Sequence, residues 1–141
     1  MEKGYVLYNP TAGNKDQTER IKVLETMVDA ELKFIDILKI KDYQVFLSGL
    51  EKNDFIIIAG GDGTLNRFVN NTDGIAFDNE ILHYPNGTGN DFALDLGYPK
   101  ECVPFPITQY LKNLPYVIVN GKNGIIVNDN PAIEIANAIK L

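Results

Sequence analysis

Residues 54–59 (DFIIIA) contain the longest apolar run of the chain and constrain its fold more than any other segment. The run does not alternate between polar and apolar residues, so a strand formed from it is expected to be covered on both faces. Such strands are typical of parallel sheets that lie between layers of helices. The segment therefore indicates an α/β fold.

Strand and helix patterns alternate along most of the chain. Further strands are predicted at 4–9, 33–37 and 80–84, and short helices at 64–71 and 91–97. This order predicts a three-layer α/β fold, in which a mainly parallel sheet is flanked by helices. Two longer helices are predicted from apolar side chains at helical spacing: Ile21, Leu24, Met27, Val28 and Leu32 in the first, and Tyr43, Phe46, Leu47 and Leu50 in the second.

The last third of the chain follows a different pattern. Residues 104–115 (PFPITQYLKNLP) predict a helical segment bounded by prolines. Two extended runs around a turn rich in Gly and Asn predict a hairpin at 116–128. Asn130 and Pro131 are typical of a helix start, so we expect a short C-terminal helix after the hairpin.

Loops of small residues follow the predicted strands at 4–9, 54–59 and 80–84. Their sequences are NPTAGN (9–14), GGDGT (60–64) and NGTGND (86–91). Ligands of open α/β sheets bind outside the carboxyl ends of the strands, so parallel and adjacent strands would place these loops along one rim. Glycines allow close backbone approach there, and helix N-termini suit phosphate. The structural alternative is that Thr64, Asn90 and Asp91 only cap helices.

Charge and composition exclude several classes of function. The formal net charge of −6 argues against a nucleic-acid groove and allows transient membrane contact at most. The single cysteine, Cys102, cannot form a disulfide within the chain and is expected to be a partly buried thiol. The N-terminus has no signal pattern, and the longest apolar run is far shorter than a membrane span, so we expect a cytoplasmic protein.

Asp62 places a negative charge at the centre of the glycine loop, where a carboxylate would repel phosphate. A cation from solution resolves the conflict, because Mg²⁺ bridges one or two carboxylates to phosphate oxygens. Asp62 and Asp91 are the candidate ligands. Alternatively, Asp62 accepts the proton of a substrate hydroxyl. The lone histidine, His83, and the aromatic residues Tyr84 and Phe92 are expected to pack rather than to bind a ligand.

The segments NPTAG (9–13), GGDGTLN (60–66) and NGTGNDFA (86–93), in this order and spacing, resemble the diacylglycerol kinase catalytic domain family. The family includes bacterial lipid kinases and sphingosine kinases, and the NAD kinases are more distant relatives. The resemblance implies that ATP binds with Mg²⁺ and that the acceptor is a lipid hydroxyl. It selects a set of nucleotide-binding residues: Asn9, Pro10, Thr11, Ala12, Gly13, Asp36, Gly60, Gly61, Asp62, Gly63, Thr64, Leu65, Asn66 and Thr88.

The same resemblance assigns Asp62 and Asp91 to a magnesium and water network, and it makes Asp62 the candidate catalytic residue, through that network or as a base. It assigns residues 1–122 to the nucleotide-binding N-terminal domain of the family. Residues 123–141 do not match and are expected to form an atypical tail. The resemblance also implies a further β-sandwich domain with the lipid pocket in family members, and we expect this chain to lack it. We therefore expect little or no kinase activity from this chain alone.

Two alternatives from other classes of protein remain. The first is a nucleotide-binding or regulatory module without catalysis, which would bind ATP but transfer no phosphate. The second is a structural fragment that forms a homodimer, which would bind no nucleotide.

Overall fold

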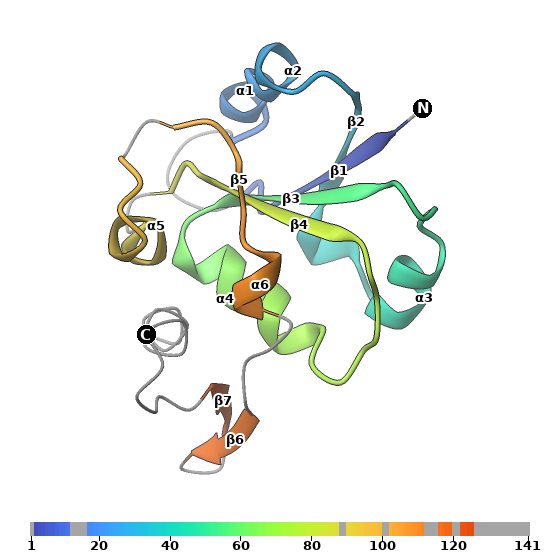
Figure 1. Ribbon diagram of the computed structural model, residues 1–141, viewed down its shortest axis with the longest axis vertical. Helices are drawn as coiled ribbons and strands as arrows, with labels where there is room; N and C mark the ends of the chain where they lie inside the picture. Colours follow the sequence, from blue (N-terminus) through green and yellow to red (C-terminus); the bar gives the residue numbers. More distant parts are fainter. Residues whose placement is uncertain are drawn as a thin grey trace.

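The computed structural model describes residues 2–11, 17–87, 90–99, 102–111, 116–119 and 122–125. Their main feature is a sheet with strand order β2-β1-β3-β4-β5 (Figure 1). Strands β1 to β4 are parallel, and β5 pairs antiparallel to β4. The strands are β1 (Lys3–Tyr8), β2 (Glu31–Asp36), β3 (Phe55–Gly60), β4 (Glu80–Pro85) and β5 (Phe105–Pro106).

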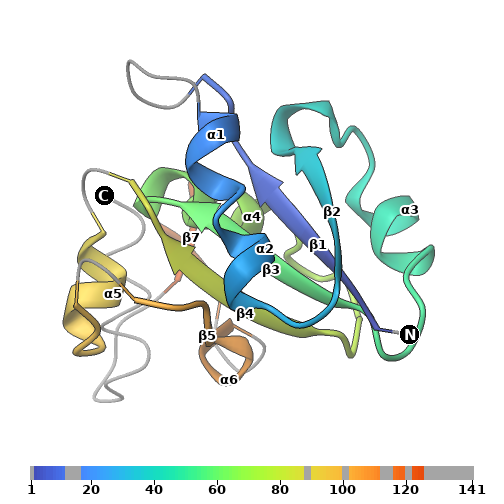
Figure 2. The same cartoon turned by 90° about the horizontal axis from the view of Figure 1, so that it is seen from above.

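Helices cover both faces of this sheet, which confirms the predicted three-layer α/β fold. In Figure 1, α1 and α2 lie on one side of the sheet and α3, α4 and α6 on the other. Figure 2 views the sheet from the side of α1 and α2, which lie in front of the strands. The helices are α1 (Gln17–Ile21), α2 (Leu24–Met27), α3 (Tyr43–Ser48), α4 (Asp62–Asn71), α5 (Asp91–Asp95) and α6 (Thr108–Leu111), with a 3₁₀ turn, η1 (Ile37–Lys39).

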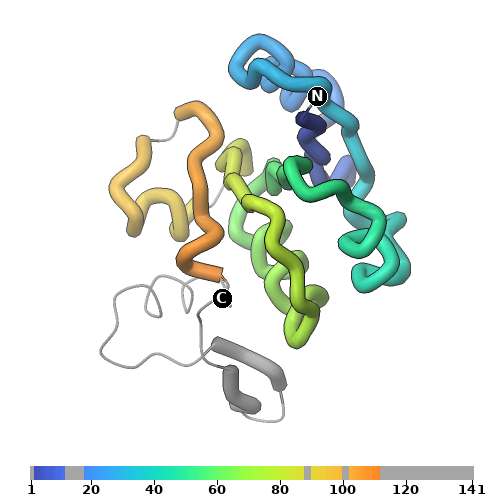
Figure 3. Tube along the Cα trace, turned by 45° about the vertical axis from the view of Figure 1, so that its right-hand side comes forward, coloured from blue at the N-terminus to red at the C-terminus, as the bar shows by residue number. Residues whose placement is uncertain are grey.

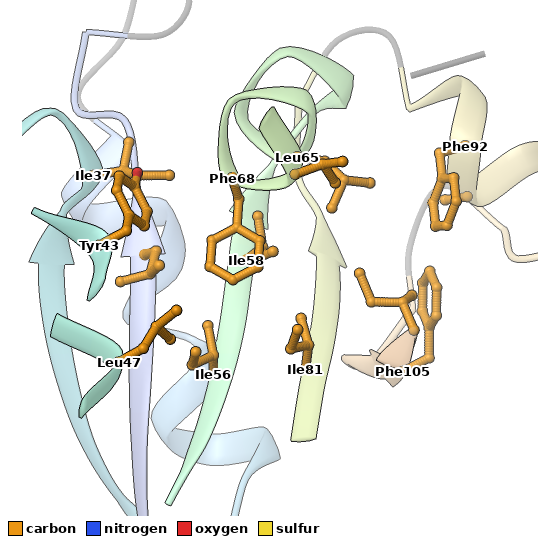
Figure 4. Close-up of a cluster of buried hydrophobic side chains, with 14 residues drawn as sticks. Ile37, Tyr43, Leu47, Ile56, Ile58, Leu65, Phe68, Ile81, Phe92 and Phe105 are labelled. Carbon is orange, nitrogen blue, oxygen red and sulfur yellow. The ribbon is translucent and has the colours of Figure 1, made fainter. Parts of the chain in front are cut away.

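The apolar run of β3 is buried on both faces, as the sequence predicts. Ile56 and Ile58 point into a core shared with α3, α4 and α5, where Phe68 and Phe92 also lie (Figure 4). Ile57 points to the opposite face and packs in the smaller core that α1 and α2 cover. Because side chains alternate across a strand, an uninterrupted apolar sequence fills two separate cores.

The parallel strands bring the three loops to one edge of the sheet. Tyr8 is in register with Asp36 on one side and with Ala59 on the other, and Gly60 is in register with Pro85. The chain leaves β1 toward β2 and leaves β3 toward β4, in opposite directions along the sheet. The boundary between β1 and β3 is therefore a topological switch point, the place where open α/β sheets bind ligands.

The first predicted helix is wrong in part. It is divided into α1 and α2, Val28 has extended backbone angles, and Leu32 lies in β2. Met27 is 39% exposed, so it does not belong to the buried face. The backbone N–H groups of Glu25 and Thr26 bond to carbonyls three residues earlier, as in a 3₁₀ turn, and these bonds mark the break between the two helices. Leu32 matches the helical spacing by coincidence, because β2 begins about one helical turn after the end of α2.

The second predicted helix is confirmed as α3. The helical segment predicted at 104–115 is wrong at its start, because Phe105 and Pro106 form the edge strand β5. An edge position tolerates the missing proline N–H, and burial of the Phe105 ring in the core holds the segment against β4. Figure 3 shows the chain from α5 to α6 on the β4 side of the sheet.

The predicted C-terminal hairpin is confirmed as β6 (Tyr116–Val119) and β7 (Lys122–Ile125), which pair antiparallel. The helix predicted after Asn130 lies outside the described residues. In the part of the chain that the structure describes, no helix combines the length and the apolar character needed to cross a membrane.

Candidate functional site

The Asp62 carboxylate is bound to the start of α5. Its two oxygens accept hydrogen bonds from the backbone N–H groups of Asp91 at 2.7 Å and Phe92 at 3.0 Å. A carboxylate suits a helix N-terminus because it pairs with N–H groups that have no partner within the helix. Asp62 therefore caps a helix that lies 29 residues further along the chain, and the negative charge joins the second loop to the third.

The glycines of these two loops are in direct backbone contact. A β-carbon on Gly87 would lie 2.5 Å from both the N and the Cα of Gly61, closer than any side chain tolerates. Asn90 precedes α5 with φ 52° and ψ 30°, a left-handed conformation that Asn adopts more readily than most residues. Its Nδ2 donates to the Gly87 carbonyl at 2.9 Å. Gly61 and Gly87 are thus explained by packing between the loops.

Gly63 differs from these glycines, because nothing lies within 4 Å of the position where its β-carbon would be. It stands in the first turn of α4, where alanine would favour the helix more than glycine does. Neither packing nor a positive φ accounts for it, since among the described residues the glycines with positive φ are Gly60, Gly74 and Gly97. A residue without a side chain leaves the N-terminus of α4 open to a ligand.

The N-terminus of α4 presents backbone N–H groups at the rim. Its first intrahelical bond runs from Leu65 N–H to the Gly61 carbonyl, so the N–H groups of Asp62, Gly63 and Thr64 precede the helical ladder. By contrast, two N–H groups at the start of α5, those of Asp91 and Phe92, are taken by Asp62, so this helix offers fewer N–H groups to a ligand than the sequence led us to expect. Leu65 itself is fully buried in the core, which argues against direct contact with a ligand.

The first loop and the end of β2 lie at the same edge. Asn9 Oδ1 accepts from the backbone N–H of Thr11 at 2.9 Å and from its hydroxyl at 2.7 Å, which closes a tight turn after β1 around Pro10. Asp36 Oδ1 accepts from Leu38 N–H at 2.9 Å. Asn66 lies in the second turn of α4. Three predicted site residues, Ala12, Gly13 and Thr88, lie outside the described residues.

The two predicted metal ligands are adjacent at the rim. The hydrogen bond from Asp91 N–H to Asp62 joins these residues, and the Asp91 side chain is exposed. Among the described residues no group of three acidic, His or Cys side chains forms a ready metal cage. The donor set fits Mg²⁺, which is held by one or two carboxylates together with waters and phosphate oxygens. Each Asp62 oxygen has lone pairs beyond those used by the N–H groups.

His83 is a core residue, as expected. Its ring is fully buried between Phe92 and Phe105, with centroid distances of 6.0 and 5.7 Å. Nδ1 donates to the Ile58 carbonyl at 3.0 Å. Burial lowers the pKa of His83 to about 4, and the hydrogen bond to Ile58 and the charge of Asp62 oppose this shift only in part. The imidazole is therefore neutral and unsuited to holding a phosphate.

The basic residue that follows the second loop, Arg67, interacts with Tyr43 of α3. Burial raises the pKa of Tyr43, and the neighbouring Arg67 charge opposes the rise. Arg67 thus lies near the α3 helix. A cation that the sequence did not single out, Arg20 of α1, lies closer to the third loop, where it lines a cleft.

This cleft of about 510 Å³ opens beside the end of β4 on the face that carries α1 and α2. Residues far apart in sequence form it, so no local motif could have revealed it. We call it the β4 cleft. Its lining residues are Arg20, Met27, Tyr84, Pro85, Asn86, Gly87, Asn90, Cys102 and Val103.

Asp62→Ala is expected to lower the free energy of unfolding by about 1–2 kcal/mol, because α5 loses its cap. Asp91→Ala retains the backbone N–H that Asp62 binds and removes only an exposed carboxylate. It should therefore change stability by less than about 0.5 kcal/mol. Urea denaturation of both variants measures the difference. Equal stability of the two variants would contradict the capping role.

Comparison with known proteins gives consistent results. The family model of the diacylglycerol kinase catalytic domain matches residues 3–122. The diacylglycerol kinase of Bacillus subtilis strain 168 is 33% identical over 111 residues, which cover 73% of this chain and 36% of that protein. This chain therefore spans about a third of that relative's length.

Solved structures agree with the fold. A diacylglycerol kinase from Bacillus anthracis strain Sterne is 26% identical, with a TM-score of 0.54, over 70% of this chain and 36% of its own. Another solved chain from the same strain is 23% identical and has a TM-score of 0.57 over 86% of this chain and 47% of its own. At that identity the second likeness supports the fold alone.

Proposed function

This chain belongs to the diacylglycerol kinase catalytic domain family, and we propose that it forms the nucleotide-binding part of a lipid kinase. In the intact enzyme, ATP would lie on the rim and its γ-phosphate would pass to a lipid hydroxyl. The relative from Bacillus subtilis is almost three times as long as the matched segment. We therefore expect this chain to bind ATP and to have little or no transfer activity by itself.

Gly63 is the observation that carries this proposal. A helical glycine with open space around its missing side chain lowers helix stability without a structural gain. It is explained if the α- or β-phosphate oxygens approach the N-terminus of α4 closely, where N–H groups and the helix dipole attract an anion. The position of α4 beside the β1–β3 switch point supports the same placement.

Asp62 and Asp91 would hold Mg²⁺ against the phosphates. When bound, the ion neutralises charge that develops on the transferred phosphoryl group. The protein contributes positioning: Asp62 ties the third loop to the second, so the exposed residue Asp91 stays beside Asp62 in the first turn of α4. Asp36 and the turn at Asn9 would contact the nucleoside end, and their position on the β2 side of the switch point supports this assignment.

Gly63→Ala provides the test. We expect ATP to bind at least about tenfold more weakly to the variant, because the added methyl group occupies the approach to the α4 N–H groups. Stability should be unchanged or raised by up to about 1 kcal/mol, as for Gly to Ala in a helix. Calorimetric titration of ATP with and without Mg²⁺, paired with urea denaturation, measures both quantities.

The matched control is Gly49→Ala, which lies at the end of α3 with only ordinary contacts and should leave ATP binding unchanged. Wild-type protein that binds no ATP in any condition would refute the nucleotide site and favour the structural-fragment alternative. Equal ATP affinity in the wild type and Gly63→Ala would refute the role of Gly63. Saturable binding without transfer to lipid is the result expected of this chain alone.

A further inference from the structure

We propose that Arg20 binds the terminal phosphate of ATP from the β4 cleft, on the face of the sheet opposite α4. The inference deepens the proposed nucleotide site and rests on it. It adds to that site a residue outside the three glycine motifs, since Arg20 belongs to α1 and its side chain lines the cleft.

A triphosphate on the rim needs more positive charge than Mg²⁺ supplies there. Asp62 and Asp91 together cancel the charge of the ion that they would hold, so the triphosphate would be left with the N–H groups of α4 alone. Two side chains that could carry positive charge do not provide it, because Arg67 interacts with Tyr43 and the His83 imidazole is neutral. Enzymes that transfer phosphate commonly complete such a site with Lys or Arg. A further cation is therefore expected.

Arg20 is available for this role. It is exposed, and it forms no hydrogen bond or ion pair with any residue that the structure describes. Lys22, which is close to it in sequence, is instead paired with Glu19 at 3.2 Å. The guanidinium of an arginine is a planar fork of N–H donors that matches two phosphate oxygens, and it remains charged near neutral pH.

The lining of the β4 cleft suits an anion. Among the described residues that line it, Arg20 is the one charged side chain, and none is Asp or Glu. The chain as a whole has the opposite balance, because its 19 acidic residues outnumber its 13 basic ones. A concave site whose lining carries one sign of charge attracts a ligand of the other sign. The volume of about 510 Å³ leaves room for a phosphate group with its waters.

Gly87 joins the cleft to the N-terminus of α4. It lines the cleft, and a β-carbon on it would lie 2.5 Å from the N and Cα of Gly61, the residue that precedes α4. Neither glycine has a side chain that would separate the two faces of the sheet at this point. A phosphate chain that starts at the N–H groups of α4 would therefore pass only backbone at these two residues on its way toward Arg20.

The strand order gives the direction of the phosphate chain. With the nucleoside end on the β2 side, the triphosphate crosses the boundary between β1 and β3, and its terminal phosphate lies nearest β4. The cleft opens beside the end of β4, on the face where Figure 2 shows α1 and α2. The inner phosphates would thus meet α4, and the terminal phosphate is the group that Arg20 would contact.

The test compares ATP, ADP and AMP by calorimetric titration in the presence of Mg²⁺. In Arg20→Gln we expect ATP to bind at least about tenfold more weakly and ADP and AMP to stay within about twofold of the wild type, because only ATP has the terminal phosphate. Arg20→Lys should recover part of the ATP affinity, since lysine keeps the charge but not the fork. The midpoint of urea denaturation should not change, because Arg20 is exposed.

The matched control is Lys22→Gln, which removes the same charge from a nearby exposed position. It should bind all three nucleotides within about twofold of the wild type, because exposed charges at a distance are screened by salt. Equal losses of ATP affinity in the two Gln variants would show a long-range effect of charge and overturn the direct contact. Equal weakening of ATP, ADP and AMP in Arg20→Gln would indicate a structural role and would also overturn it.

The remaining outcomes separate this inference from the function on which it rests. A wild type that binds ATP, with unchanged affinity in Arg20→Gln, would overturn the inference and leave the nucleotide site standing. Equal weakening of ATP and ADP, with AMP unaffected, would move the contact to an inner phosphate and overturn the assignment to the terminal one. A wild type that binds none of the three nucleotides would refute the nucleotide site itself, and the inference with it.

Discussion

Gly87→Ala is expected to lower the free energy of unfolding by about 2–3 kcal/mol and to abolish ATP binding, although residue 87 need not touch the nucleotide. The added β-carbon would lie 2.5 Å from the N and Cα of Gly61. Both atoms belong to the backbone, so no side-chain rotation relieves the clash. The second and third loops must therefore separate.

Separation of these loops would act on the candidate site through Asp62. Its hydrogen bonds to Asp91 and Phe92 span the two loops, and they lengthen or break when the loops move apart. The measurement is urea denaturation together with calorimetric titration of ATP. Gly49→Ala is the control, with its nearest atom at 3.5 Å. A Gly87→Ala protein with wild-type stability would show that the backbone contact is not formed.

Acidification from pH 7 to pH 4 is expected to remove about 3 kcal/mol of stability through His83 alone. The folded-state pKa is about 4, below the ordinary value of 6.5, because burial disfavours the imidazolium. Above pH 6.5 the ring is neutral in both states and the folded state has its full stability. As the pH falls through the window from 6.5 to 4, the unfolded state takes up a proton first, and stability declines.

His83→Leu isolates this effect from the titration of carboxylates. The variant loses the hydrogen bond to Ile58 at every pH, so it should be less stable near neutrality but vary less between pH 6.5 and 4.5. The difference between the wild type and the variant, measured by urea denaturation at several pH values, reports His83. Parallel stability curves would contradict a neutral, buried imidazole.

Much of the fold follows from local patterns. The apolar run of β3 predicted a strand buried on both faces, and alternating strand and helix patterns predicted the parallel sheet. Prediction was weakest where tertiary contacts override local spacing. Leu32 continued a helical pattern but lies in β2, and Phe105 looked helical but is held against β4 by burial in the core.

For the candidate site, too, the sequence predicted the location but not the role of each residue. The glycine motifs located the rim, because parallel strands place successive loops at one edge. The sequence could not reveal what Asp62 does, since its partners at Asp91 and Phe92 depend on how two loops meet. The sequence also gave every loop glycine the same interpretation, which was close approach of the backbone. The structure distinguishes Gly61 and Gly87, which touch, from Gly63, which touches nothing.

The sequence by itself determined the order of the central elements, the α/β class and the family, because all of these depend on short-range periodicity and on contiguous motifs. Only the tertiary structure decided the role of each polar group at the rim. Asn90 became a buried acceptor, and Arg20 and Val103 came to share a cleft, through contacts between segments that are distant in sequence. Burial and hydrogen-bond partners arise when the chain is packed, and local pattern does not encode them.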